Sequence, residues 1–134
     1  MDIVSKITFP GGKRIDAEVG PHLIRTDQPR DKGGAGTAPE PFALFAASIG
    51  TCAGLYVLAF CRARDLPVEG LRLTERLRFE TDRLAAVELD LELPPGFPER
   101  YRDAVLRAAE ECKVKRAIEA QPRFVVRALT ARAA

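Results

Sequence analysis

Two stretches near the start of the chain alternate between apolar and polar residues, which is the pattern of half-buried β-strands. Residues 3–9 and 15–19 are separated by a Pro-Gly-Gly turn, and together they predict a hairpin. A short third strand is expected at residues 23–26. Residues 27–40 are rich in glycine, proline and aspartate, so a loop is expected there.

Two longer alternating stretches follow in the second half of the chain. In residues 71–79 arginines alternate with leucines, whereas in residues 87–93 acidic side chains alternate with apolar ones. Each stretch therefore predicts a strand with one buried face and one charged face. The basic face of one strand and the acidic face of the other suit antiparallel neighbours joined by cross-strand ion pairs.

Between these strands lies a long segment without charge. Residues 42–61 follow Pro41, which suits the first position of a helix, and precede Pro67, which suits its stop. A helix that is apolar on every side is either buried in a core or spans a membrane. Small residues (Ala, Gly, Ser and Thr) interrupt this apolar run, and amphipathic strands flank it. Both features favour a buried central helix over a membrane span.

The last part of the chain predicts two helices and a strand. An amphipathic helix is expected to open at Pro98 and to end at Cys112, with a short helical segment at residues 113–120 and a closing strand at 124–129. Strands are grouped with strands rather than alternating with helices. This order predicts an α+β fold with a mainly antiparallel sheet, in a single domain over residues 1–134.

Composition and the spacing of metal-binding residues argue against several classes of function. The net charge of the 134 residues is only +2 and no basic patch interleaves with aromatics, so nucleic acid is not expected as a partner. The N-terminus lacks the layout of a signal peptide, and a cytoplasmic location is expected. One histidine and three scattered cysteines do not have the spacing of a zinc site, so neither a metal nor a cofactor is expected.

Two of the three cysteines have two interpretations each. Cys52 lies midway along the long apolar helix, where a thiol is either a small core residue or a reactive group. Cys112 precedes Lys113, Lys115 and Arg116, whose charges lower a thiol pKa but also complement the helix dipole. Cys61 is nine residues after Cys52 and faces the opposite side of the helix, so it is expected to be core.

Ordered motifs in the chain resemble the OsmC/Ohr family, in its broad OsmC-like branch. They are a glycine-rich segment at residues 32–36, Pro41 opening a long apolar helix, Cys52 eleven positions later, and Cys112 followed by a basic segment. The resemblance implies an α+β fold in which an antiparallel sheet packs on a long buried central helix. It also implies an intertwined homodimer.

The activity that the resemblance implies is thiol-dependent reduction of organic hydroperoxides by a two-cysteine mechanism, in defence against oxidative stress. Cys52 corresponds to the peroxidatic cysteine, and Cys112 to the cysteine that resolves its sulfenic acid. An external dithiol reductant would restore the pair, and no membrane partner is expected. Arg14 is the preferred cation beside the thiolate. The alternatives for this role are Lys13, Arg25 and Arg30.

One departure from the family pattern bears on this activity. Family peroxidases carry a glutamate directly after the proline that opens the helix, whereas this chain has Phe42. Glu40 lies two residues earlier and either takes this catalytic role or complements the helix dipole. An alternative function is therefore a non-catalytic or differently active OsmC-like module that binds a small apolar or thiol-reactive ligand. For the peroxidase, the apolar lining expected to favour organic hydroperoxides over hydrogen peroxide is Phe42, Leu44, Phe45, Leu55 and Tyr56.

Overall fold

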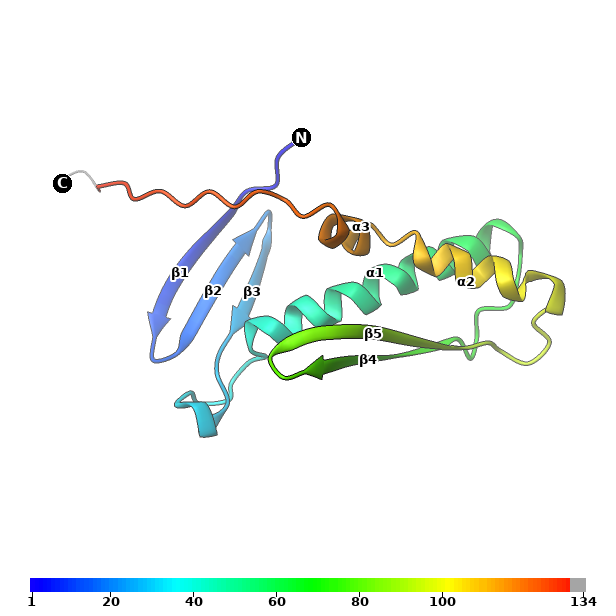
Figure 1. The fold of residues 1–134 in the computed structure, drawn as a ribbon, viewed down its shortest axis with the longest axis horizontal. Helices are drawn as coiled ribbons and strands as arrows, with labels where there is room; N and C mark the ends of the chain where they lie inside the picture. The colour runs from blue at the N-terminus through cyan, green and yellow to red at the C-terminus, as the bar shows by residue number, and fades with distance from the viewer. Residues whose placement is uncertain (131–134) are drawn as a thin grey trace. The chain divides into compact units, whose positions relative to one another are not determined.

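The computed structural model describes residues 1–130 and contains, over that range, a three-stranded sheet, a two-stranded hairpin and three α-helices (Figure 1). Short 3₁₀ turns precede α1 and α2. The order of elements is β1 (Ser5–Gly11), β2 (Arg14–Val19), β3 (His22–Thr26), the turn Arg30–Lys32, α1 (Pro41–Ala63), β4 (Arg72–Glu80), β5 (Arg83–Glu92), the turn Glu99–Tyr101, α2 (Arg102–Glu110) and α3 (Lys113–Glu119).

The chain forms two compact units, whose boundaries fall within α1, β4 and β5. Unit 1 comprises Met1–Thr51 and Glu75–Leu89, and unit 2 comprises Cys52–Thr74 and Asp90–Ala134. Unit 1 therefore holds the three-stranded sheet, and unit 2 holds α2 and α3. The expectation of a single domain stays a prediction.

The sheet of unit 1 is an antiparallel meander in the order β1-β2-β3. Ser5 pairs with Val19 across the first hairpin, and Ile15 pairs with Thr26 across the second. The turn between β1 and β2 needs Gly12, whose φ of 56° lies in the left-handed region. These elements confirm the predicted hairpin and third strand. Every residue of β1 is exposed, so this edge of the sheet has no cover among the described residues.

The hairpin of β4 and β5 carries the predicted complementary charges. Arg72 lies 3.6 Å from Glu92 in unit 2, and Arg78 pairs with Glu88 in unit 1. These ion pairs confirm the prediction that the basic face of one strand meets the acidic face of the other. All four side chains are largely exposed, so the pairs set the register of the strands more than they stabilise the fold.

Helix α1 confirms the helix predicted from the uncharged run, but its burial is limited. Its buried residues recur at every fourth position, at Ile49, Ala53, Val57 and Cys61. Leu55, on another face, is 63% exposed. The single chain thus buries one stripe of the helix, and the expected burial on all sides is not confirmed. By length and composition α1 also passes the test for a membrane span, which core helices of soluble proteins pass as well.

Unit 2 has a small apolar core on α1 and α2. Val57, Cys61 and Val105 are almost completely buried and contact one another. Phe60 packs edge-on against Tyr101 at a ring separation of 6.1 Å. Partly buried side chains surround this core: Phe60, Leu66, Val68, Leu71, Leu91, Leu93, Phe97 and Ala109.

Two predictions about the C-terminal part are wrong for the single chain. Residues 124–129 form no strand, because a strand requires a neighbouring backbone to pair with and none is provided. Helix α2 begins later than predicted and ends at Glu110, so Cys112 lies outside it. The second helical segment is confirmed as α3.

Candidate active site

Cys112 occupies the junction between two helices. Glu111 closes α2, and Cys112 has an extended ψ of 124° that starts α3 as its N-cap residue. Its Sγ accepts a hydrogen bond from the backbone N–H of Lys115 at 3.4 Å, in the way that a serine or aspartate usually caps a helix. The side chain is almost fully buried. Its position is therefore fixed by the backbone of α3.

Cys52 lies on the half of α1 that belongs to unit 2, and its side chain is partly buried. Side-chain hydrogen bonding between the two cysteines is one cause that lowers the pKa of Cys52 and raises that of Cys112. The fold therefore brings together two cysteines that are far apart in the sequence. This juxtaposition is what formation of a disulfide between them requires.

The environment of the pair makes its two thiols unequal. Backbone hydrogen bonding from Val114 is the main cause that lowers the pKa of Cys52, and burial opposes it. The Cys112 thiol, the backbone of Lys113 and the charge of Arg116 lower this pKa further. Burial raises the pKa of Cys112, and the neighbouring Cys52 sulfur raises it as well. Cys52 is thus the first of the two to become a thiolate, while Cys112 retains its proton.

This result corrects one expectation from the sequence. The basic residues after Cys112 were expected to lower its pKa, but burial outweighs them there. The charge of Arg116 lowers the pKa of Cys52 instead. Sequence reasoning missed this connection because only the folded chain brings α3 to α1. The spacing of Arg116, one helical turn after Cys112, was the available signal.

Cys61 has a different environment. It is fully buried in the apolar core of unit 2, and burial raises its pKa. A buried neutral thiol is a poor nucleophile. The prediction that Cys61 is a core residue is confirmed.

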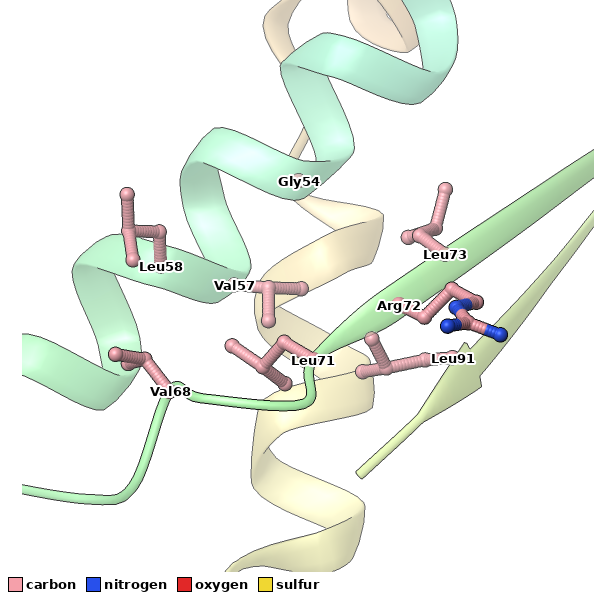
Figure 2. Close-up of a pocket in the computed structure, with 8 residues that line it drawn as sticks. All are labelled: Gly54, Val57, Leu58, Val68, Leu71, Arg72, Leu73 and Leu91. Carbon is pink, nitrogen blue, oxygen red and sulfur yellow. The ribbon is translucent and has the colours of Figure 1, made fainter. Parts of the chain in front are cut away.

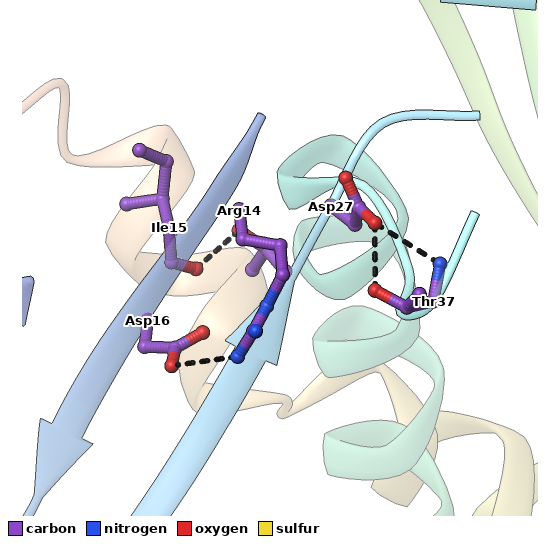
Figure 3. Close-up of polar contacts among 6 residues, drawn as sticks. Arg14, Ile15, Asp16, Asp27 and Thr37 are labelled. Carbon is purple, nitrogen blue, oxygen red and sulfur yellow. Dashed lines mark hydrogen bonds and ion pairs between the residues drawn. The ribbon is translucent and has the colours of Figure 1, made fainter. Parts of the chain in front are cut away.

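The two other predicted site residues lie in unit 1. Arg14, on β2, pairs with Asp16 at a distance of 3.5 Å between Nη2 and Oδ2 (Figure 3). Glu40 precedes α1 and pairs with Lys32 at 3.3 Å. Both belong to a unit other than that of the Cys52–Cys112 pair. Their roles beside the thiolate stay predictions.

An apolar cavity of about 320 Å³ lies between the second half of α1 and the hairpin strands of unit 2 (Figure 2). Among the described residues, Arg72 is the only charged side chain in its wall. The lining includes none of the five apolar residues expected from the sequence, one of which, Phe42, packs against Phe45 and Phe79 in unit 1. The residues around the cavity are Gly54, Val57, Leu58, Val68, Leu71, Arg72, Leu73 and Leu91.

Metal-binding side chains do not converge anywhere in residues 1–130, where no three His, Cys, Asp or Glu side chains are close enough to share an ion. The chemistry that the described site offers is that of its two thiols.

Comparison with known proteins places this site in a family context. The sequence model of the family described as "OsmC-like protein" matches residues 33–127. No curated protein matches the chain in sequence. Among solved structures, a Psychrobacter arcticus protein assigned to the osmotic stress and detoxification response is 23% identical, with a TM-score of 0.69, over 84% of this chain and 85% of that one.

Two other solved structures are similar in fold. An organic hydroperoxide resistance protein OsmC from Legionella pneumophila is 22% identical, with a TM-score of 0.59, over 88% of this chain and 89% of that one. An organic hydroperoxide resistance protein from Elizabethkingia anophelis, with thiocyanate bound, is 21% identical, with a TM-score of 0.63, over 87% of both chains. At these identities the likeness shows the α+β fold.

Proposed function

The chain belongs to the OsmC-like protein family, and on this premise we propose that it reduces organic hydroperoxides in defence against oxidative stress, with Cys52 and Cys112 as a redox pair. The observation that carries the proposal is that Cys52 and Cys112 lie close enough to shift each other's pKa, with the pKa of Cys52 lowered and that of Cys112 raised. Two structures of similar fold are named organic hydroperoxide resistance proteins, which supports this class of substrate.

The reaction begins with nucleophilic attack. The Cys52 thiolate attacks one peroxide oxygen, the O–O bond breaks, and the alkoxide takes a proton and leaves as the alcohol. Cys52 is thereby oxidised to the sulfenic acid. The Cys112 sulfur then attacks the Cys52 sulfur, a disulfide forms, and the hydroxyl leaves as water with the Cys112 proton. An external dithiol reduces the disulfide by thiol–disulfide exchange.

Each thiol is suited to its step. A lowered pKa gives Cys52 a larger thiolate fraction at neutral pH, which is the form that attacks a peroxide. The raised pKa of Cys112 favours its protonated form, so that Cys52 is the nucleophile of the first step. Since the two thiols are neighbours in the fold, the second step joins groups that already lie near each other.

The experiment is intact-mass analysis after one equivalent of cumene hydroperoxide. We expect the reduced chain to lose two hydrogens, with the bond mapped to Cys52 and Cys112. Cys112→Ser should gain one oxygen, trapped at Cys52 by dimedone, and Cys52→Ser should be unchanged. Cys61→Ser is the matched control and should behave as the wild type. Equal consumption of peroxide by wild type and Cys52→Ser would exclude the mechanism.

The apolar cavity of unit 2 supports a second candidate function, in which an OsmC-like module binds a small apolar or thiol-reactive ligand without turnover. Phe42, in place of the glutamate that family peroxidases carry, motivates this alternative. It predicts that ligand is retained on purification and that the measured pKa of Cys52 is that of an ordinary thiol. A lowered measured pKa with catalytic turnover of peroxide would exclude it.

A homodimer belongs to the same proposal. The exposed edge of β1 and residues 122–130, which form no strand, offer backbone groups that pairing between two copies would satisfy. Large apolar side chains lie exposed in both segments, among them Phe9 at 78% and Val126 at 93%. Sedimentation of the full chain tests this part. A monomer at micromolar concentration would contradict it.

A further inference from the structure

A glutamate of β4 lies with its carboxyl group against the backbone of α1, within unit 1. A Cβ atom at Gly50 would lie 3.5 Å from the Cδ and Oε1 atoms of Glu75, so the carboxyl group rests directly on this turn of the helix. Within residues 1–130, its buried Oε2 atom has no hydrogen-bond partner. The proposed redox chemistry makes no use of this carboxyl group.

A second contact joins the same strand to the start of the helix. The ring of Phe79 lies 5.8 Å from that of Phe42, which lies 5.3 Å from that of Phe45. The distance from Glu75 to Phe79 is about 13 Å along the strand, and that from Gly50 back to Phe42 is about 12 Å along the helix. The strand therefore follows the helix between the two contacts. Together they hold the tip of the β4–β5 hairpin on the first half of α1.

The carboxyl group faces no charged group of the elements that pack against it in unit 1. The first half of α1, residues 41–51, contains no titratable side chain. Side chains alternate along β4, so Arg76 and Arg78 project from its other, exposed face, where Arg78 pairs with Glu88 of β5. The remaining charged side chains of the hairpin in this unit are exposed around its turn, at Glu80, Asp82 and Arg83.

This environment favours the protonated acid. Burial raises the pKa of Glu75, and hydrogen bonding from the backbone of Gly50 opposes it only in part. If the hairpin leaves the helix, water solvates the carboxyl group, which regains an ordinary glutamate pKa of about 4.3. Undocking therefore becomes easier as the pH rises from about 4.3 to the raised pKa, and it is independent of pH outside this window.

We propose that Glu75 makes the contact between α1 and the tip of the β4–β5 hairpin a pH-sensitive latch, closed when the carboxyl group is protonated and loosened when it is ionised. The aromatic rings hold the tip on the helix, and the charge on Glu75 sets how firmly. Phe42 and Phe79 are already 48% and 51% exposed, so few contacts need to break. Opening of the latch uncovers the apolar first half of α1.

The test is native-state hydrogen exchange of the full-length reduced protein, followed by NMR between pH 4 and pH 8 at several sub-denaturing urea concentrations. A two-stranded hairpin is only marginally stable alone, so the amides of residues 76–88 should exchange when the latch opens. Their protection factors should fall about tenfold for each pH unit within the window. They should depend only weakly on urea, because a local opening exposes little surface. A ¹³C titration of the Glu75 carboxyl group measures the window itself.

Three variants separate the latch from a general effect on stability. Glu75→Gln keeps the shape of the side chain without its charge, and it should remove the pH dependence of exchange in the hairpin. Glu80→Gln is the matched control, since Glu80 is an exposed glutamate of the same strand, and it should leave this dependence unchanged. Phe79→Ala should lower the protection of the hairpin at every pH and keep the dependence.

Three results would each overturn the proposal. One is a Glu75 carboxyl group that titrates as an ordinary glutamate does. Another is a pH dependence that survives in Glu75→Gln. The third is exchange of the hairpin amides with the urea dependence of global unfolding, which would mean that the hairpin does not open locally.

Discussion

Oxidation of the proposed redox pair should stabilise the protein by an amount that follows from the fold. The bond between Cys52 and Cys112 would close a loop of about 60 residues. Chain entropy assigns about 4 kcal/mol of stabilisation to a loop of this length. Strain in the native chain would subtract from this figure. For a domain of this size we expect the Tm to rise by roughly 10 °C or more.

The assay compares thermal and urea unfolding of the reduced protein with that of the protein oxidised by one equivalent of cumene hydroperoxide. Cys112→Ser should show no such increase, whereas Cys61→Ser should show the full increase. An oxidised form that is no more stable than the reduced one would refute the reasoning, because it would mean that the disulfide distorts the native chain. An increase that persists in Cys112→Ser would assign the oxidation to another residue.

Other predictions concern single side chains. Arg116→Gln should raise the pKa of Cys52 and slow its alkylation at pH 7 about two- to fivefold; an unchanged rate would contradict this. Burial raises the pKa of Glu75, so Glu75→Gln should raise the free energy of unfolding at pH 7, by about 1.4 kcal/mol per pKa unit, and have no effect below about pH 4, where the carboxyl is protonated in both states. Equal gains at pH 3 and pH 7 would contradict it. Val105→Ala should lower the free energy of unfolding by about 1.5–3 kcal/mol in urea, and a loss below about 0.5 kcal/mol would mean that the core collapses around the change. Hydrogen bonds, those from Thr37 foremost, lower the pKa of Asp27 to about 2. The stabilisation that ionised Asp27 contributes is complete above about pH 4 and should be lost as the pH falls to about 2. Unfolding curves measured across this pH range test it, and Asp27→Asn should remove this contribution to the pH dependence.

Most elements of the fold were predictable because their signals are local. The alternation in β4 and β5 predicted both strands and the charge pairs between them, and the proline before the uncharged run predicted the start of α1. The strand expected at residues 124–129 depends on a pairing partner outside the segment. Local periodicity therefore could not decide it. The burial of α1 could not be predicted for the same reason, because the sequence of the helix does not show which other elements cover its remaining faces.

The candidate site was predictable only in part. Family motifs pointed to Cys52 and Cys112, and the phase of the helix separated Cys61 from them. The pKa shifts of Cys52 and Cys112 could not be predicted from the sequence, because the burial of Cys112 and the approach of α3 to Cys52 arise only on folding. The cap made by the Cys112 sulfur was equally hidden, since the end of α2 at Glu110 is not marked by a proline or glycine.

That cap links the redox state of a sulfur to the start of a helix. The Cys112 sulfur accepts the Lys115 N–H, so any change in its covalent state alters the first turn of α3. Hydrogen exchange at the Lys115 amide should therefore differ between the dithiol and the disulfide forms. One backbone proton would then report whether the chain is in its dithiol or its disulfide form.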